Sequence, residues 1–162
     1  MTRGSNDPHF DLRHPGPPTV LRYMEVPQPI CPDDGVLIRV EAAAIEGGDL
    51  ISRASIKPPH LDFVIGYAAA GEIIEVGQNV SNRHVGQKVT SFDLSGSHAE
   101  LRAIPVSRTW PVPEGPDMPA AAALPITFGT AYNCFFTRGV LKRGETVLVP
   151  AGATVIATVS GS

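Results

Sequence analysis

Short apolar runs alternate with turn-forming residues over the first two thirds of the chain. Runs that are rich in β-branched residues, or that alternate between apolar and polar side chains, predict β-strands. Gly, Pro, Asn and Asp separate the runs, and these are the residues that tight turns require. The predicted strands cover residues 20–26, 35–45, 69–77, 85–92 and 98–104. Strands at such short intervals favour a closed or partly closed β-barrel.

The pattern changes to helical spacing near Pro119. This proline precedes a run of alanines and predicts the start of a helix, because the first turn of a helix accommodates proline. Helical spacing continues to Phe136 and places Phe128 and Tyr132 on the same face as that residue. Gly139 is predicted to end the helix. Further upstream, one helical turn is predicted over residues 49–55.

The C-terminal residues predict two strands that are joined too tightly to be parallel. Thr146–Val149 has the composition of the strand that opens a dinucleotide-binding fold, and Thr154–Val159 reads as the next strand. Only Pro150–Ala153 separate the two, whereas a parallel crossover needs about a dozen residues or more. Four residues close an antiparallel hairpin, with Gly152 in a left-handed conformation. We therefore expect no phosphate-binding loop between these strands.

Composition and charge exclude several classes of function. The 162 residues are 43% hydrophobic, which is enough for one packed domain, and the net charge of −3 gives no basic surface for nucleic acid. No apolar stretch approaches the roughly 18 residues of a membrane span, and the N-terminus lacks a signal-peptide core. We expect a cytoplasmic protein without nucleic-acid or membrane partners. Cys31 and Cys134 are expected to be reduced thiols, the alternative being a disulfide or metal pair.

The order of these segments resembles the medium-chain dehydrogenase/reductase superfamily, and within it the zinc-independent quinone oxidoreductases and enoyl reductases. The resemblance rests on the ordered series over residues 9–149 rather than on any single piece. The matching stretches are residues 36–42, 49–53, 65–71, 76–77, 85–89, 96–100, 121–124, 130–132 and 139–149.

The resemblance implies a mainly β fold with some α. Its parts are a GroES-like, partly closed β-barrel, then a helix and a truncated Rossmann remnant of two strands without a crossover helix. We expect a flexible N-terminal segment and first strand over 1–18, the barrel over 19–125, and the helix with the nucleotide-binding remnant over 126–162.

The resemblance also assigns candidate site residues. Candidates for the substrate pocket are Glu46, Asp49, Arg53, Lys57 and Tyr67. Candidates for cofactor contact are Thr127 and Thr130, because the family residue that matches Thr127 lies near the nicotinamide ring. No catalytic residue is assigned. Zinc-dependent relatives carry a Cys where this chain has Glu46 and a His where it has Tyr67, so no zinc is expected.

Structural explanations compete with these assignments. Thr127 and Thr130 equally suit ordinary helix packing, and Glu46 with Lys57 suits a solvated loop pair. Asp49 and Arg53 have the spacing of an i,i+4 ion pair on a helix. His60 and His98 are expected to be surface or strand residues rather than bases.

Two functions from different classes follow. The resemblance implies an NADPH-dependent quinone oxidoreductase or enone reductase, although we expect the lone chain not to be redox-competent, because the phosphate-binding loop is absent. The alternative is a non-redox GroES-like scaffold, ligand-binding or assembly module. A third, acid–base chemistry by Glu46 and Lys57, depends on their burial. A small-molecule ligand and a homodimer through exposed C-terminal strands are the expected partners.

Overall fold

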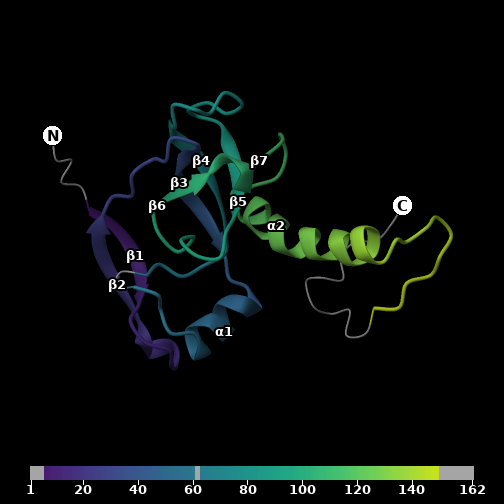
Figure 1. The fold of residues 1–162 in the computed structure, drawn as a ribbon, viewed down its shortest axis with the longest axis horizontal. Coiled ribbons are helices and arrows are strands. Elements are labelled where there is room, and N and C mark those ends of the chain that lie inside the picture. The colour runs from purple at the N-terminus through teal and green to yellow at the C-terminus, as the bar shows by residue number, and fades with distance from the viewer. Residues whose placement is uncertain (1–5, 61–62, 150–162) are drawn as a thin grey trace.

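A computed structural model of the chain describes residues 6–60 and 63–149, and within these ranges it contains seven strands and two α-helices (Figure 1). The strands are β1 (Asn6–Leu12), β2 (Leu21–Pro27), β3 (Gly35–Ala44), β4 (Ala68–Val76), β5 (Lys88–Phe92), β6 (Leu101–Pro105) and β7 (Thr109–Pro111). The helices are α1 (Gly47–Ser55) and α2 (Met118–Tyr132). Short 3₁₀ turns lie at Pro18–Val20 and Val106–Arg108, and a π-helical turn, Asn133–Arg138, continues α2.

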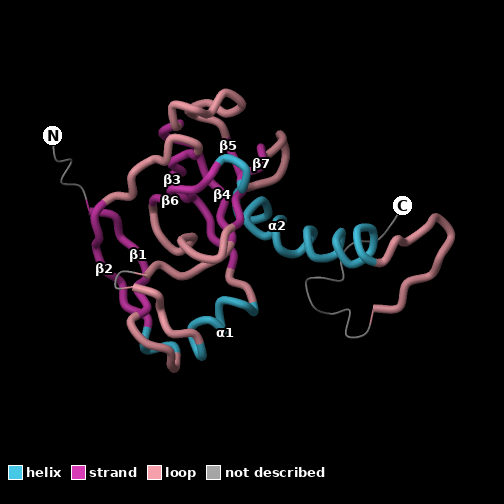
Figure 2. The backbone as a smooth tube through the Cα atoms, in the orientation of Figure 1, coloured by secondary structure: helices cyan, strands magenta, loops and turns pink. Residues whose placement is uncertain are grey.

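The strands form a two-stranded hairpin, β1-β2, and a five-stranded antiparallel sheet in the order β6-β3-β4-β5-β7. The two edge strands of this sheet, β6 and β7, are joined by only the three residues Val106–Arg108. The edges of a flat five-stranded sheet lie roughly 19 Å apart, whereas the chain from Pro105 to Thr109 reaches at most roughly 14 Å. The sheet must therefore curl until its edges approach, as Figure 2 shows, and the prediction of a partly closed barrel is confirmed.

The barrel core is a cluster of β-branched side chains from four strands. Val36 and Ile38 of β3 pack with Ile73 of β4, Val89 of β5 and Ile104 of β6, and each is almost completely buried. Burying one such side chain stabilises the fold by roughly 1.5–3 kcal/mol. On β4 and β6 these positions alternate with half-buried residues, whereas on β3 the residue between Val36 and Ile38, Leu37, is also buried.

The first turns of α2 cover one face of the sheet through small side chains. Ala121 and Ala122 pack against Ala70 of β4 with Met118, and the Thr90 Oγ1 donates a 2.7 Å hydrogen bond to the Ala121 carbonyl. Alanine has so little bulk that the helix backbone can approach the sheet closely. The second half of α2 extends away from the barrel (Figure 1).

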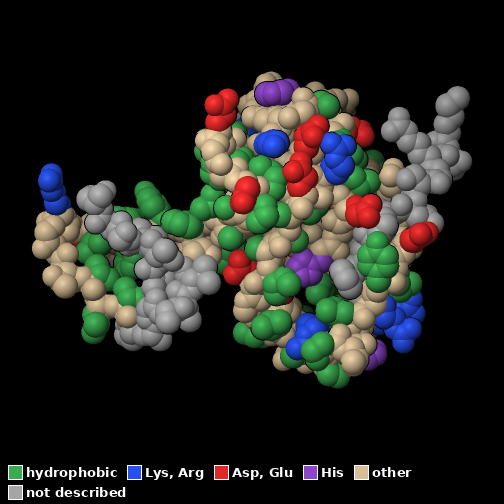
Figure 3. Space-filling view, turned by 180° about the vertical axis from the view of Figure 1, so that it is seen from behind, with side chains coloured by type: hydrophobic (Ala, Val, Ile, Leu, Met, Phe, Trp, Pro, Cys, Tyr) green, Lys and Arg blue, Asp and Glu red, His purple; other side chains and the backbone are tan. Residues whose placement is uncertain are grey.

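The predicted helix ends are confirmed. The Asp117 side chain caps the start of α2 by accepting a 2.8 Å hydrogen bond from the Ala120 N–H. Gly139 ends the π-helical turn, and its N–H donates to the Cys134 carbonyl at 2.9 Å. The rings of Tyr132 and Phe136 are in contact, with centroids 5.2 Å apart, so they share a face as predicted. Figure 3 shows hydrophobic side chains along this projecting part of the molecule, and the acidic side chains that are visible from this side lie over the rest of the molecule.

Three sequence predictions need correction. The segment that begins at Val85 is a turn around Gly86, which has a φ of +86°, and β5 starts only at Lys88. The strand expected from His98 starts at Leu101. The strand expected over Thr146–Val149 is not formed; these residues have no regular secondary structure and are exposed. A strand needs a neighbouring strand to pair its N–H and C=O groups, and none of the described strands pairs with residues 146–149. The second predicted strand, Thr154–Val159, and the link before it lie outside the described residues.

Candidate functional site

Tyr67 lies against the backbone of α1 because α1 has a glycine at the point of contact. A Cβ at Gly48 would collide with the Tyr67 ring, so only glycine allows this approach. One turn further along α1, the Ser52 Oγ and the Tyr67 hydroxyl are joined by a 2.7 Å hydrogen bond. The Tyr67 ring also makes an edge-to-face contact with Phe92, with centroids 6.4 Å apart. These contacts fix both the plane of the ring and the position of its hydroxyl.

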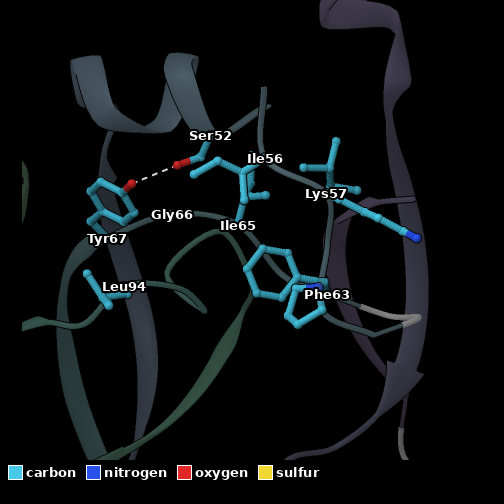
Figure 4. A pocket seen from close by; sticks show the side chains of 10 residues that line it. Ser52, Ile56, Lys57, Phe63, Ile65, Gly66, Tyr67 and Leu94 are labelled. Carbon is cyan, nitrogen blue, oxygen red and sulfur yellow. Dashed lines mark hydrogen bonds between the residues drawn. The ribbon is translucent and has the colours of Figure 1, made fainter. Parts of the chain in front are cut away.

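One side of Tyr67 faces a cavity of about 410 Å³, the α1 cavity (Figure 4). Its lining is mostly apolar and comes from the end of β1, from α1, from the segment between α1 and β4, and from the loop after β5. The lining residues are Leu12, Ser52, Ile56, Lys57, Pro59, Phe63, Ile65, Gly66, Tyr67 and Leu94. Lys57 extends its ammonium group away from Tyr67, at the other end of the cavity (Figure 4). Of the five predicted pocket residues, the α1 cavity brings together Lys57 and Tyr67.

Tyr67 also lines a second cavity of about 410 Å³, the α2 cavity, between the barrel and α2. Its other lining residues are Phe92, Pro125, Ile126, Gly129, Thr130 and Asn133. The two cofactor candidates are separated here. Thr130 faces the cavity, whereas Thr127, which is 4% exposed, is absent from its lining and lies within the packed part of the helix.

Glu46, Asp49 and Arg53 hold α1 in place and line neither cavity. The Asp49 carboxylate accepts a 2.8 Å hydrogen bond from the Glu46 N–H, which caps the helix. Arg53 donates to the Gly16 carbonyl instead of pairing with Asp49. The expected Asp49–Arg53 ion pair is therefore wrong, because a backbone carbonyl lies within reach of the guanidinium and the Asp49 carboxylate is occupied at the helix start.

Burial sets the electrostatics at this helix start. Burial raises the pKa of Asp49, against the opposing effects of the Glu46 N–H and of the charge on His98. Burial and the neighbouring Asp49 charge raise the pKa of Glu46. The second Asp49 oxygen, Oδ1, and the His98 Nε2 are both buried without a hydrogen-bond partner. The solvated pair expected of Glu46 and Lys57 is not formed by any described contact, since Glu46 is half-buried beside Asp49.

Arg102 supports the backbone of Tyr67, and reasoning from the sequence missed it. It is 2% exposed and donates three hydrogen bonds of 2.9 Å, to the Tyr67 carbonyl, the Ser95 carbonyl and the Ser91 Oγ. Burial lowers the pKa of Arg102 to about 10, partly offset by the charge of Asp93. Arg102 has the same parity along β6 as the core residue Ile104, and this alternation is the signal that could have found it.

Comparison with known proteins identifies the family. Residues 32–114 match the family described as the alcohol dehydrogenase GroES-like domain. The chain belongs to this family. As its segment order predicted, this GroES-like protein is a member of the medium-chain dehydrogenase/reductase superfamily, with quinone oxidoreductases and enoyl reductases among its structural neighbours.

One curated protein and two solved structures show how similar this chain is to other members of the superfamily. The rat (Rattus norvegicus) "Synaptic vesicle membrane protein VAT-1 homolog" is 34% identical over 128 residues, which are 77% of this chain and 32% of that protein. The quinone oxidoreductase from Coxiella burnetii is 28% identical with a TM-score of 0.84, over 94% of this chain and 51% of that one. A mycobacterial protein solved in complex with NADPH is 32% identical with a TM-score of 0.85, over 93% of this chain and 47% of that one. The GroES-like chain thus spans about a third of the curated relatives and half of the solved ones.

Two further findings concern metals and membranes. Within residues 6–60 and 63–149, no three His, Cys, Asp or Glu side chains come together as a metal site. Tyr67 and Glu46, which stand where zinc-dependent relatives carry ligands, are a cavity wall and a helix cap here. No helix in the described part of the chain has the length and apolar character to cross a bilayer.

Proposed function

We propose that this chain supplies the substrate side of an NADPH-dependent oxidoreductase that reduces a conjugated carbonyl compound, a quinone or an enone. The observation that carries this proposal is the placement of Tyr67, whose ring is held between two cavities in a family that includes quinone oxidoreductases. Tyr67 supplies a fixed hydroxyl beside otherwise apolar walls. A carbonyl oxygen needs such a donor, whereas the flat apolar part of a quinone or enone needs the walls.

In this proposal the α2 cavity takes the quinone or enone ring, beside Tyr67, together with the nicotinamide end of the cofactor, and it does not suit the cofactor's phosphates. Gly129 allows close approach, and Thr130 and Asn133 carry groups that can bind a carboxamide. Phosphates are bound by free N–H groups at a helix N-terminus, but the N-terminal turn of α2 is packed on the barrel. The cavity lies along the C-terminal half of α2, where the helix dipole disfavours anions. The phosphate groups must therefore be bound by residues other than these.

In this division of roles, bound NADPH supplies a hydride to the conjugated system, and water supplies the proton that completes the reduction. The chain's own residues bind and orient the acceptor. Tyr67 donates its hydroxyl hydrogen to the carbonyl oxygen, and Phe92 and Ile126 exclude water around the ring. Arg102 and Gly48 act only through Tyr67, by holding its backbone and its ring, and so they are positioning residues.

Calorimetric titration of the purified chain tests this proposal. A tailless quinone, 2,3-dimethoxy-5-methyl-1,4-benzoquinone, should bind with heat, and binding should be lost in Gly129→Trp, which fills the α2 cavity. Phe128→Trp, on the exposed side of the same helix, is the matched control and should bind normally. NADPH at millimolar concentration should produce no thermal shift, whereas a ligand at 100 times its Kd adds about 2.7 kcal/mol. Absence of quinone binding refutes the substrate role, and a clear NADPH shift refutes the division of roles.

The second candidate function is a non-redox ligand-binding or assembly module. The exposed rings of Phe128, Tyr132 and Phe136 favour it, as does the exposed apolar run at Val147–Val149, because exposed apolar surface marks contact sites. Under this proposal the chain forms a homodimer through this C-terminal part. Light scattering should then give a dimer that Phe136→Glu dissociates, and a monomer at all concentrations would argue against it.

A further inference from the structure

We propose that the α1 cavity binds the apolar tail of the substrate, so that the preferred substrates carry an alkyl chain on their quinone or enone ring. This inference rests on the proposed function, since it places the ring in the α2 cavity. The tail then passes the Tyr67 ring, which lines both cavities.

The chemistry of the α1 cavity suits an alkyl chain. Most of its lining side chains are hydrocarbon, contributed by residues such as Leu12, Ile56 and Ile65. Its two hydroxyl groups, on Ser52 and Tyr67, are hydrogen-bonded to each other at 2.7 Å; with Ser52 as the donor, the Tyr67 hydrogen serves the substrate carbonyl oxygen, and neither hydroxyl hydrogen is left for a second polar ligand group. The ammonium group of Lys57 points away from them (Figure 4). A polar ligand would find few groups to bind, whereas each buried methylene raises the affinity by about fourfold.

The cavity is also held open by fixed backbone. The segment that forms its floor is bonded to the loop before β6: the Gly96 N–H donates to Val64 O at 2.9 Å, and the His98 N–H donates to Ile65 O at 3.0 Å. On the other side, the Leu12 N–H donates to Phe63 O at 3.3 Å, and Leu12 itself is 1% exposed. A volume of about 410 Å³ lies in the range typical of ligand sites, roughly 300–1,000 Å³. Such a preformed cavity binds a chain without the cost of reshaping its walls.

The alternative occupant is a free fatty acid, with its carboxylate on Lys57. Two observations favour the tail of a larger substrate. Tyr67 lines both this cavity and the one where a ring fits, and the Lys57 ammonium points away from Tyr67 (Figure 4). The fatty acid is therefore an outcome of the test rather than the proposal.

The test compares two quinones with the same ring by calorimetry on the whole chain. The tailless 2,3-dimethoxy-5-methyl-1,4-benzoquinone is measured against its 6-decyl derivative. The decyl compound should bind at least tenfold more tightly, since two buried methylenes are already enough for that factor. Two blocking variants, Ile56→Trp and Leu94→Trp, lie at exposed positions in the cavity wall, which makes unfolding a small risk. Ile51→Trp is the control, because Ile51 is an exposed residue of α1 that does not line the cavity.

The inference is supported if both blocking variants remove the tenfold higher affinity for the decyl quinone and Ile51→Trp keeps it. The tailless quinone should bind the wild type and all three variants with equal affinity. If the decyl advantage survives both blocking variants, the tail lies elsewhere and the inference is wrong. If the tail adds nothing to wild-type binding, the inference is wrong while the proposed function stands. If neither quinone binds the wild type, both this inference and the proposed function are wrong. Decanoate that binds as tightly as the decyl quinone, also in Gly129→Trp, would identify a fatty-acid site and overturn the inference.

Discussion

Replacement of Arg102 by methionine tests whether a buried cation supports the site. Methionine keeps much of the volume of the side-chain stem, so the change removes the guanidinium without opening a large cavity. The three hydrogen bonds of 2.9 Å to Tyr67, Ser95 and Ser91 are lost together. Tyr67 O keeps the hydrogen bond from the Asp93 N–H at 3.0 Å, and the Ser91 Oγ still donates to Ala69 O, so neither is left without a partner.

Two opposing contributions decide how far Arg102→Met changes the free energy of unfolding. Hydrogen bonds from a charged donor contribute about 1.5–3 kcal/mol each, or roughly 4–9 kcal/mol for three. Against this stands the desolvation of the guanidinium, which is several kcal/mol for a buried ion and which is also the cause of the lowered pKa of about 10. We expect Arg102→Met to lower the free energy of unfolding by about 2–4 kcal/mol, because the bonds outweigh the desolvation only in part.

Urea denaturation followed by the fluorescence of Trp110, the one tryptophan of the chain, measures this change. Arg102→Lys is the matched variant: it keeps the charge, but one ammonium group cannot replace the planar fork, so it should also be destabilised. Quinone affinity should fall in both variants, because the Tyr67 backbone loses its support. A methionine variant as stable as the wild type, or more stable, would refute the reasoning and show that desolvation outweighs the three bonds.

Four other substitutions test the same region. Tyr67→Phe and Ser52→Ala should each cost about 1 kcal/mol of stability, and a double-mutant cycle should show them coupled; additive costs would mean that the 2.7 Å hydrogen bond contributes nothing. Gly48→Ala should cost about 1–3 kcal/mol and weaken quinone binding, because the new methyl group displaces the Tyr67 ring; unchanged binding would contradict this. Asp49→Asn tests the raised pKa of Asp49: the carboxyl's contribution is full below its unfolded pKa and is lost as pH rises through the native pKa. The variant should therefore gain stability relative to the wild type as the pH rises above roughly 4, the ordinary pKa of a carboxyl group, as paired urea titrations would show; a constant difference would exclude the shift.

The sequence predicted most of the strands and both helices because these depend on local patterns, whereas β7 was not predicted and the strand expected over Thr146–Val149 is not formed. Apolar runs bounded by turn residues located β3 and β4 within a residue or two, and the proline and glycine at the ends of the second helical segment marked its limits. The site was predicted only in part, because cavities depend on which distant segments meet. Leu12, Phe63 and Leu94 come from three separate parts of the chain, and no local pattern links them. Spacing suggested that Arg53 pairs with Asp49, but the tertiary fold offered it the Gly16 carbonyl instead.

The short link between β6 and β7 also determines where the barrel can meet other molecules. The Val106 N–H donates to Asp34 O at 3.1 Å, and the Arg83 guanidinium donates to Thr109 O at 2.8 Å, on the outer side of the last strand. A foreign strand that tried to extend the sheet here would have to displace this arginine and detach the link. These hydrogen bonds hold the β6–β7 link and the last strand in place at this end of the barrel. Inserting residues between Val106 and Arg108 should loosen the link and expose an unpaired strand edge that is prone to aggregation.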